Sequence, residues 1–271
     1  MQKIIGLILI LMSTILLSSC NVDSDKGTHS KKHTIIIAGS TSVMPFIEKL
    51  SEHFMVDRPL FRINIQGGGS TAGIQACLNK TIDIGMSSRQ LKQEEMVLKD
   101  IIVCYDGISV VVHPENPIRE LTLKQIKGIF SGQIKNWKEL GWVDRKIDAI
   151  TREEGSGTRG SFEDLIMKSE EIYDGIMVQD SNGSVKEIVA TDPYAIAYIS
   201  LGLVDNRVRA LSIDGVSATL KNIKTKKYKF VRPFLFLTNG MPNEFVHTFI
   251  DFVLSVDGQN ILKKEGLIGI K

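Results

Sequence analysis

The chain has 271 residues, of which 43% are hydrophobic, and this is enough for two lobes of ordinary domain size with a core in each. Its formal net charge is only +2, which does not indicate the clustered basic surface of a nucleic-acid-binding protein. Four lysines do gather at Lys224, Lys226, Lys227 and Lys229, but this pattern is more typical of an exposed, solvated segment.

The N-terminus has the parts of a secretory leader. Met1–Lys3 supplies a short positive region, Ile4–Leu17 is almost entirely apolar, and Cys20 follows two serines. Because the apolar run is shorter than the ~20 residues that span a bilayer, we predict a signal peptide over residues 1–19. Small residues before a cysteine resemble a bacterial lipobox, in which Cys20 is lipidated; a plain signal peptide with a chance cysteine is the alternative. Residues 20–33 are polar and aperiodic, which predicts a flexible tether.

The remaining cysteines and the histidines give no sign of a disulfide framework or a metal site. Cys77 falls on the apolar face of an expected helix and Cys104 follows a strand signal, so we expect two buried free thiols, with a single disulfide as the alternative. The histidines are scattered without metal-ligand spacing, and we expect no metal and no cofactor. They are His29 and His33, assigned to the solvated tail, and His53, His113 and His247, assigned to helix or strand surfaces.

From residue 34 onward strand and helix signals alternate, which predicts an α/β fold with largely parallel sheets. The expected elements of the first part are strands 35–38, 61–65, 82–86, 101–103 and 107–113 and helices 44–56 and 71–79. The loop Pro114–Pro117 marks a change of lobe. Beyond it we expect helices 121–130, 133–140, 161–168, 185–190, 243–255 and 258–264, and strands 147–150, 195–199 and 233–237. The charged segment 205–229 carries little periodicity.

Three loops share one pattern, in which an apolar strand runs into Gly, Ser and Thr residues and then into a helix. They are Gly39–Ser42, Gly67–Thr71 and Thr151–Gly160. The first N–H groups of a helix lack partners within it and lie at the positive end of the helix dipole, and hydroxyls add further donors. Glycine lets an oxyanion approach the backbone, and Arg152 offers a rigid fork of donors. One such loop means little, but three together predict an anion site.

Enzyme motifs fit the chain poorly. A Gly-x-Ser-x-Gly elbow around Ser70 is interrupted by Ala72, and Ser156 lacks it as well. The residues Gly155, Gly157 and Gly160 match the dinucleotide pattern literally, but Glu153 and Glu154 before them would repel a pyrophosphate. An oxyanion-binding protein is therefore favoured over an enzyme that uses Ser156 or Ser70 as a nucleophile.

Five motifs together resemble, in the same order, the phosphate-binding protein of the bacterial high-affinity phosphate importer. They are Gly39–Ser42, Gln66–Ser70, Asp83–Arg89, Arg152–Thr158 and Pro193–Tyr198. The resemblance covers 34–270 and implies a two-lobed periplasmic-binding-protein fold of type II, with the ligand cleft between two α/β lobes. It further implies that the chain is not an enzyme but a monomeric solute-binding protein on the extracytoplasmic face of the membrane, held there by the N-terminal lipid. Its partners would be inorganic phosphate and the permease and ATPase subunits of an ABC transporter.

The resemblance also implies site residues. Donors from the first lobe would be Thr41, the Ser42 backbone N–H and Ser70, and donors from the second would be Arg152, Ser156, Gly157 and Thr158. We expect Glu154 to orient Arg152. Lobe one is expected to comprise 34–115 and 226–271, and lobe two 116–225.

One position departs from the family pattern. Many members have an aspartate where this chain has Ser88, and that aspartate accepts the proton of hydrogen phosphate, which sulfate lacks. Asp106 could supply the missing acceptor if it points into the cleft; an ordinary Asp turn before Gly107 is the alternative. Sulfate, molybdate and tungstate therefore stay open as other ligands.

Overall fold

The computed structural model describes residues 32–270, and the predictions for the signal peptide, Cys20 and His29 lie outside them. None of the helices in that range is both long enough and apolar enough to cross a bilayer. His33, which we assigned to the tether, instead begins the first strand, and its ring stacks on Phe245 with centroids 3.6 Å apart.

The main sheet runs in the order β2-β1-β3-β12-β4-β8-β6-β7, and a small sheet has the order β11-β10-β5. The strands are β1 (His33–Gly39), β2 (Phe61–Gly67), β3 (Ile84–Ser87), β4 (Lys99–Val112), β5 (Glu120–Leu121), β6 (Asp148–Arg152), β7 (Met177–Gln179), β8 (Ala195–Ser200), β9 (Arg209–Ala210), β10 (Ser212–Ile213), β11 (Val216–Ser217), β12 (Val231–Thr238) and β13 (Ile268–Gly269). The α-helices are α2 (Met44–Val56), α3 (Ser70–Leu78), α4 (Leu123–Phe130), α5 (Gly157–Phe162), α6 (Asn182–Thr191), α7 (Leu220–Lys224), α8 (Glu244–Leu254) and α9 (Val256–Lys264). Short 3-10 turns lie at Gln93–Glu95, Trp137–Leu140 and Leu201–Leu203, and a π-helical turn lies at Glu163–Met167.

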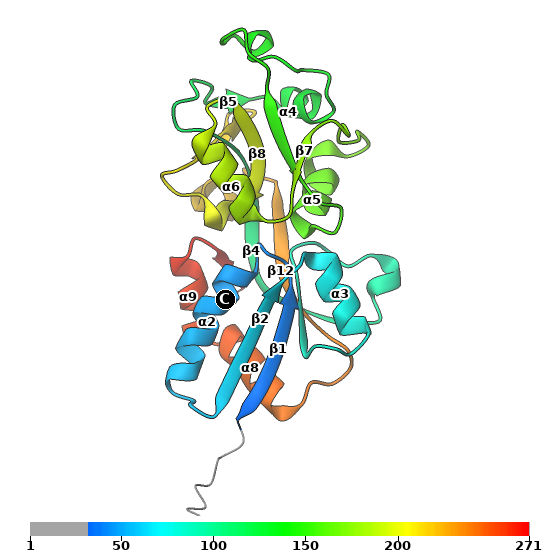
Figure 1. Cartoon of the computed structure of the whole chain (residues 1–271). Coiled ribbons are helices and arrows are strands. Elements are labelled where there is room, and N and C mark those ends of the chain that lie inside the picture. The colour runs from blue at the N-terminus through cyan, green and yellow to red at the C-terminus, as the bar shows by residue number, and fades with distance from the viewer. Residues whose placement is uncertain (1–31, 271) are drawn as a thin grey trace, which may run out of the picture. The chain divides into compact units, whose positions relative to one another are not determined.

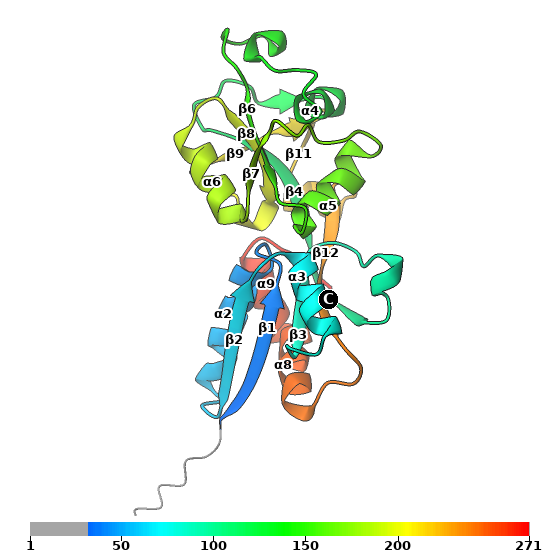
Figure 2. The ribbon, with the colours of Figure 1, turned by 45° about the vertical axis from the view of Figure 1, so that its right-hand side comes forward.

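Lobe one is a sheet with helices on both faces, because its central strand β12 is apolar on both sides. Phe234 and Phe236 pack with α2, α8 and α9, whereas Leu235 and Leu237 pack with α3 on the opposite face. This alternation follows from the two-residue period of a strand. Figures 1 and 2 show the helices on either side of β1 and β2.

Lobe two is built on the same plan around β8. Ile196 and Tyr198 join the large cluster that includes α4 and α5, whereas Ala197 and Ile199 face α6. In this lobe Phe162 stacks on Tyr198, with ring centroids 3.8 Å apart. This stack fixes α5 against the sheet, and α5 carries the central loop of the predicted anion site.

Two antiparallel strands join the lobes, as Figure 1 shows for β4 and β12. The first half of β4 pairs with β12 and its second half with β8. The core of lobe one uses β4 up to Cys104, and the core of lobe two begins at Ile108. We propose that the chain passes between lobes within 105–107 and again near 231–233, somewhat inside the limits expected from sequence.

Several elements differ from the expectations. The two strands expected at 101–103 and 107–113 form the single strand β4, and the helix expected over 133–140 is only the turn Trp137–Leu140. The helix expected to begin at 161 already begins at Gly157. The segment 205–229 holds β9, β10, β11 and α7, although its clustered lysines are exposed as expected. Cys77 and Cys104 are both buried and free, and burial raises the pKa of each thiol.

Candidate functional site

The three Gly/Ser/Thr loops meet between the lobes. The Gly69 N–H donates to the Gly39 carbonyl (3.1 Å), which joins the two loops of lobe one. The Thr71 N–H donates to the Gly155 carbonyl (3.0 Å), which joins lobe one to the central loop of lobe two. The three loops predicted to form one site are thus in direct contact with one another.

The central loop is held in shape by the N-cap of α5. The Ser156 hydroxyl accepts hydrogen bonds from the backbone N–H groups of Thr158 and Arg159, both at 3.2 Å. This is the ordinary action of serine at a helix N-cap, so the sequence Ser-Gly-Thr both starts the helix and shapes the loop. The Ser156 oxygen is occupied as an acceptor, and its hydroxyl proton is left to donate.

Hydroxyl groups from both lobes line the contact. In lobe one Ser40 Oγ donates to Ser88 Oγ (2.9 Å), and the Ser88 N–H donates to Ser70 Oγ (3.0 Å). Ser42 Oγ lies 2.6 Å from Thr158 Oγ1 of lobe two. Ser40, which our sequence reasoning did not select, belongs to this group through its place in the first loop.

Arg152 is the charged donor expected at the site, and it is only 1% exposed. Its Nε and Nη2 donate to the two carboxylate oxygens of Glu153, both at 3.0 Å, and Nη2 also reaches Thr41 Oγ1 of lobe one (3.2 Å). Glu153 therefore orients the guanidinium, whereas we had expected Glu154 to do so. The backbone carbonyls of Gln179, at the end of β7, and of the following Asp180 accept from the same guanidinium.

One nitrogen of this guanidinium is left over. Within residues 32–270, Arg152 Nη1 is buried and has no hydrogen-bond partner. A buried cationic N–H without a partner costs free energy, so native structures rarely leave one unmatched. Such a group among buried hydroxyls is suited to an anion.

Asp106 does not stand free in the cleft. Its Oδ2 accepts from Arg232 Nε (3.1 Å) and Nη2 (3.0 Å), and both side chains are 1% exposed. Its Oδ1 accepts more weakly from the Gly202 N–H (3.4 Å). Burial raises the pKa of the Asp106 carboxyl, and pairing with Arg232 opposes this shift.

Arg232 and Asn182 were both missed by sequence reasoning. Arg232 Nη1 donates to the Ser88 carbonyl (3.3 Å), directly behind the hydroxyl cluster. Asn182 Nδ2 donates to Ser42 Oγ (2.7 Å), across the lobes. The partners of these residues are 144 and 140 positions away in the chain, and no local pattern signals such contacts.

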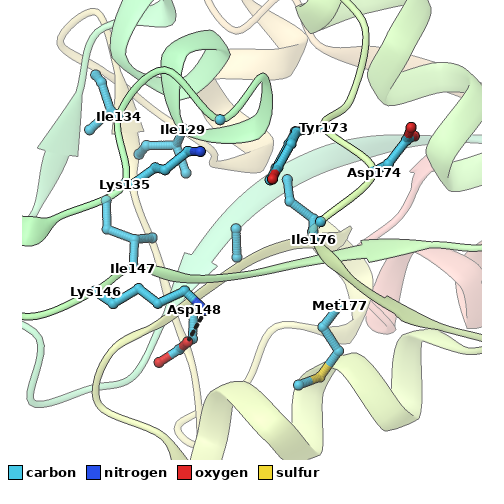
Figure 3. Close-up of a pocket in the computed structure, with 13 residues that line it drawn as sticks. Ile129, Ile134, Lys135, Lys146, Ile147, Asp148, Tyr173, Asp174, Ile176 and Met177 are labelled. Atoms are coloured by element: carbon cyan, nitrogen blue, oxygen red, sulfur yellow. Dashed lines mark ion pairs between the residues drawn. The ribbon is translucent and has the colours of Figure 1, made fainter.

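A cavity of about 310 Å³ lies elsewhere, within lobe two (Figure 3). Its wall combines isoleucines with charged side chains, and its two lysines are already engaged: Lys146 pairs with Asp148 (3.6 Å), and Lys135 lies 4.6 Å from the Tyr173 ring centroid. None of the residues that we predicted to bind an anion line it. We therefore place the candidate site between the lobes.

The chemistry of the interlobe site is that of a binding site for an oxyanion. It combines a guanidinium, hydroxyls and helix N–H groups, all of which donate hydrogen bonds. The two described histidine rings that make hydrogen bonds do so with the Glu115 N–H and with Asp251, so neither activates a serine here. Residues 32–270 also contain no group of three or more side chains suited to a metal ion.

Comparison with known proteins decides the family. A family model described as a PBP superfamily domain matches residues 24–257. The phosphate-binding protein PstS of Bacillus subtilis is 34% identical to this chain over 92% of the chain and 85% of its own length. This chain belongs to the PstS family of phosphate-binding proteins.

Two solved structures support the fold of this PstS-family chain. A phosphate ABC transporter substrate-binding protein from Clostridium perfringens, solved with bound phosphate, is 43% identical with a TM-score of 0.85, over 88% of this chain and 100% of that one. An ABC-type phosphate transport receptor from Vibrio cholerae is 36% identical with a TM-score of 0.72, over the same shares of each chain. The expected two-lobed periplasmic-binding-protein fold is confirmed.

Proposed function

We propose that this chain captures inorganic phosphate between its two lobes and passes it to an ABC importer without chemical turnover. The observation that carries the proposal is the buried Arg152 Nη1, which has no hydrogen-bond partner within residues 32–270 and belongs to a guanidinium whose Nη2 contacts Thr41 Oγ1 of lobe one. Membership of the PstS family supports phosphate as the anion. The site's donors would replace the water around the anion, and exclusion of solvent strengthens each of these contacts.

The donors proposed from sequence fit this arrangement. Lobe one would offer Thr41, Ser70 and Ser88, which lie at the loop contacts described above, and the Ser42 N–H, which in this structure donates to Ser40 Oγ (3.2 Å). Lobe two would offer Arg152, the hydroxyls of Ser156 and Thr158 and the Gly157 N–H. Asp106 would not contact the anion. It would position Arg232, which donates a hydrogen bond to the Ser88 carbonyl.

Calorimetric titration with inorganic phosphate tests the proposal. We expect one phosphate per chain, and incubation of the protein with phosphate monoesters should release no product. Sulfate, molybdate and tungstate serve as competitors, because Ser88 replaces the family's aspartate and Asp106 is engaged by Arg232. Failure of phosphate to bind, or stronger binding of another oxyanion, would contradict phosphate as the ligand.

Location and partners belong to the same proposal. The sequence around Cys20 supports a lipid anchor that holds a monomer on the extracytoplasmic face, next to the permease and ATPase subunits of its importer. Cys20→Ala should release the protein from the membrane while phosphate affinity stays unchanged, because the tether offers no ligand group. Membrane retention of this variant would contradict the anchor.

A further inference from the structure

Asn182 links the two lobes at the candidate site. It is the first residue of α6 and is 1% exposed. Its Nδ2 donates to Ser42 Oγ of lobe one (2.7 Å), and its Oδ1 accepts from the Ser200 N–H at the end of β8 (3.3 Å). A buried amide with both ends engaged has one fixed orientation.

The Ser200 contact decides which end of the amide faces Ser42. A backbone N–H can only donate, so the oxygen of Asn182 must face Ser200. The NH₂ group is thereby directed at Ser42. The group next to Ser42 is therefore a hydrogen-bond donor, and Ser42 Oγ accepts the hydrogen bond from Asn182 Nδ2.

This donor controls the protons of the next pair. Ser42 Oγ and Thr158 Oγ1 lie 2.6 Å apart, close enough that one proton lies between them and one is left over. With a donor at position 182, neither hydroxyl gives its proton to Asn182, so one proton stays available for an anion. Acceptance from Asn182 also makes Ser42 a stronger donor to Thr158, because linked hydrogen bonds polarise one another.

We infer that Asn182 is a positioning residue of the oxyanion site. It directs the hydrogen bonds from Asn182 to Ser42 and from Ser42 to Thr158, so that Thr158 presents its hydroxyl proton to the bound anion. The inference rests on the proposed phosphate binding and adds a specific requirement: position 182 must donate. An acceptor there would draw one proton away, and the hydroxyl pair would keep none for the anion.

The test is calorimetric titration of inorganic phosphate into wild type, Asn182→Ala and Asn182→Asp. We expect a loss of about tenfold in affinity for alanine, since the chain of bonds is no longer directed. For Asn182→Asp we expect phosphate affinity to fall by about a hundredfold or more, because the carboxylate replaces the donor with a charged acceptor. Asn182→Ser, which keeps a small donor, should bind more tightly than Asn182→Asp and serves if the alanine variant does not fold.

A double-mutant cycle separates positioning from structure. If Asn182 acts through Ser42, Asn182→Ala should change phosphate affinity little in a chain that already carries Ser42→Ala. Asn116→Ala is the matched control, since Asn116 is a fully buried asparagine of the same lobe bonded to the Pro193 carbonyl and the Ile118 N–H. It should lower Tm and leave phosphate affinity unchanged.

Each outcome has one meaning. Wild-type affinity in Asn182→Ala, additive losses in the cycle, or equal affinity of the alanine and aspartate variants would overturn the inference while phosphate binding stands. Absence of phosphate binding by the wild type would instead overturn the proposed function.

Discussion

A methyl group added to Gly157 would lie 2.1 Å from Ser70 Oγ. The same group would lie 2.6 Å from Ser88 Oγ, and both serines belong to lobe one. Gly157 is the first residue of α5 in lobe two, and its backbone does not adopt the positive φ that favours glycine. The residue is therefore small because the other lobe comes so close to it.

Gly157→Ala should weaken phosphate binding by about tenfold or more without loss of stability, because alanine suits a helix but prevents full closure of the lobes. Calorimetric titration and thermal unfolding check the two halves of this prediction. Gly160→Ala is the control on the same helix, since its methyl group would meet only the Cδ of the Arg89 side chain, at 3.2 Å. Equal affinities for wild type and Gly157→Ala would show that binding does not require this approach.

Arg152→Ala should weaken phosphate binding by roughly 2–4 kcal/mol, because it removes the buried charge-assisted donor. Arg152→Lys should recover only part of the loss, since an ammonium cannot contact Glu153 and an anion with the same fixed fork. The exposed Arg145 provides the control, and Arg145→Ala should bind as wild type does. Unchanged affinity in Arg152→Ala would move the site elsewhere.

Asp106→Asn should destabilise the fold by about 3–5 kcal/mol, because it leaves the Arg232 guanidinium buried with a neutral partner. Urea unfolding measures this loss, and the double variant Asp106→Asn with Arg232→Met should regain part of it. Paired titrations should show similar changes for phosphate and sulfate. A loss confined to phosphate would mean that Asp106 accepts the phosphate proton directly, as we first considered from the sequence.

Acid should weaken the buried Arg89–Glu95 ion pair of lobe one. Two hydrogen bonds from Arg89, at 2.7 and 2.8 Å, lower the pKa of the Glu95 carboxyl below its ordinary value of 4.5. A depressed pKa contributes stability above the unfolded value, and this contribution is lost as the pH falls through the folded value. The free energy of unfolding of wild type should therefore fall more steeply below about pH 4.5 than that of Glu95→Gln.

Urea unfolding at several pH values measures this difference. The adjacent, exposed Glu94 gives the control, and Glu94→Gln should keep the wild-type pH dependence. Parallel curves for wild type and Glu95→Gln would contradict a role for the ion pair.

The sequence predicted the elements whose patterns are local. The helix over 44–56 was predicted to the residue, and strand β12 to within two residues at its start, because periodicity and flanking loops mark both. The three anion-type loops were found for the same reason, since each lies between a strand and a helix. Strand β4 was split in two because Asp106 and Gly107 resemble a turn in the sequence, whereas in the structure Arg232 of the neighbouring strand pairs with the buried Asp106.

Contacts between distant segments could not be predicted in this way. Arg232 lies in an apolar strand and Asn182 follows a helix cap, so each has an ordinary local explanation. Their roles follow from Ser88 and Ser42, which the fold brings beside them from the other lobe or the far end of the chain. The orientation of Arg152 by Glu153 instead of Glu154 likewise depends on which side of a turn faces the guanidinium.

The order of strands in lobe one also bears on how the chain folds as it is made. Strand β12 lies between β3 and β4, so the sheet of the first lobe to be synthesised stays interrupted until residues near the C-terminus arrive. Phe234, Phe236 and Phe249, which fill its core, are likewise among the late residues. The native sheet of lobe one can therefore be completed only after the whole of lobe two has been synthesised, although lobe one begins the folded part of the chain.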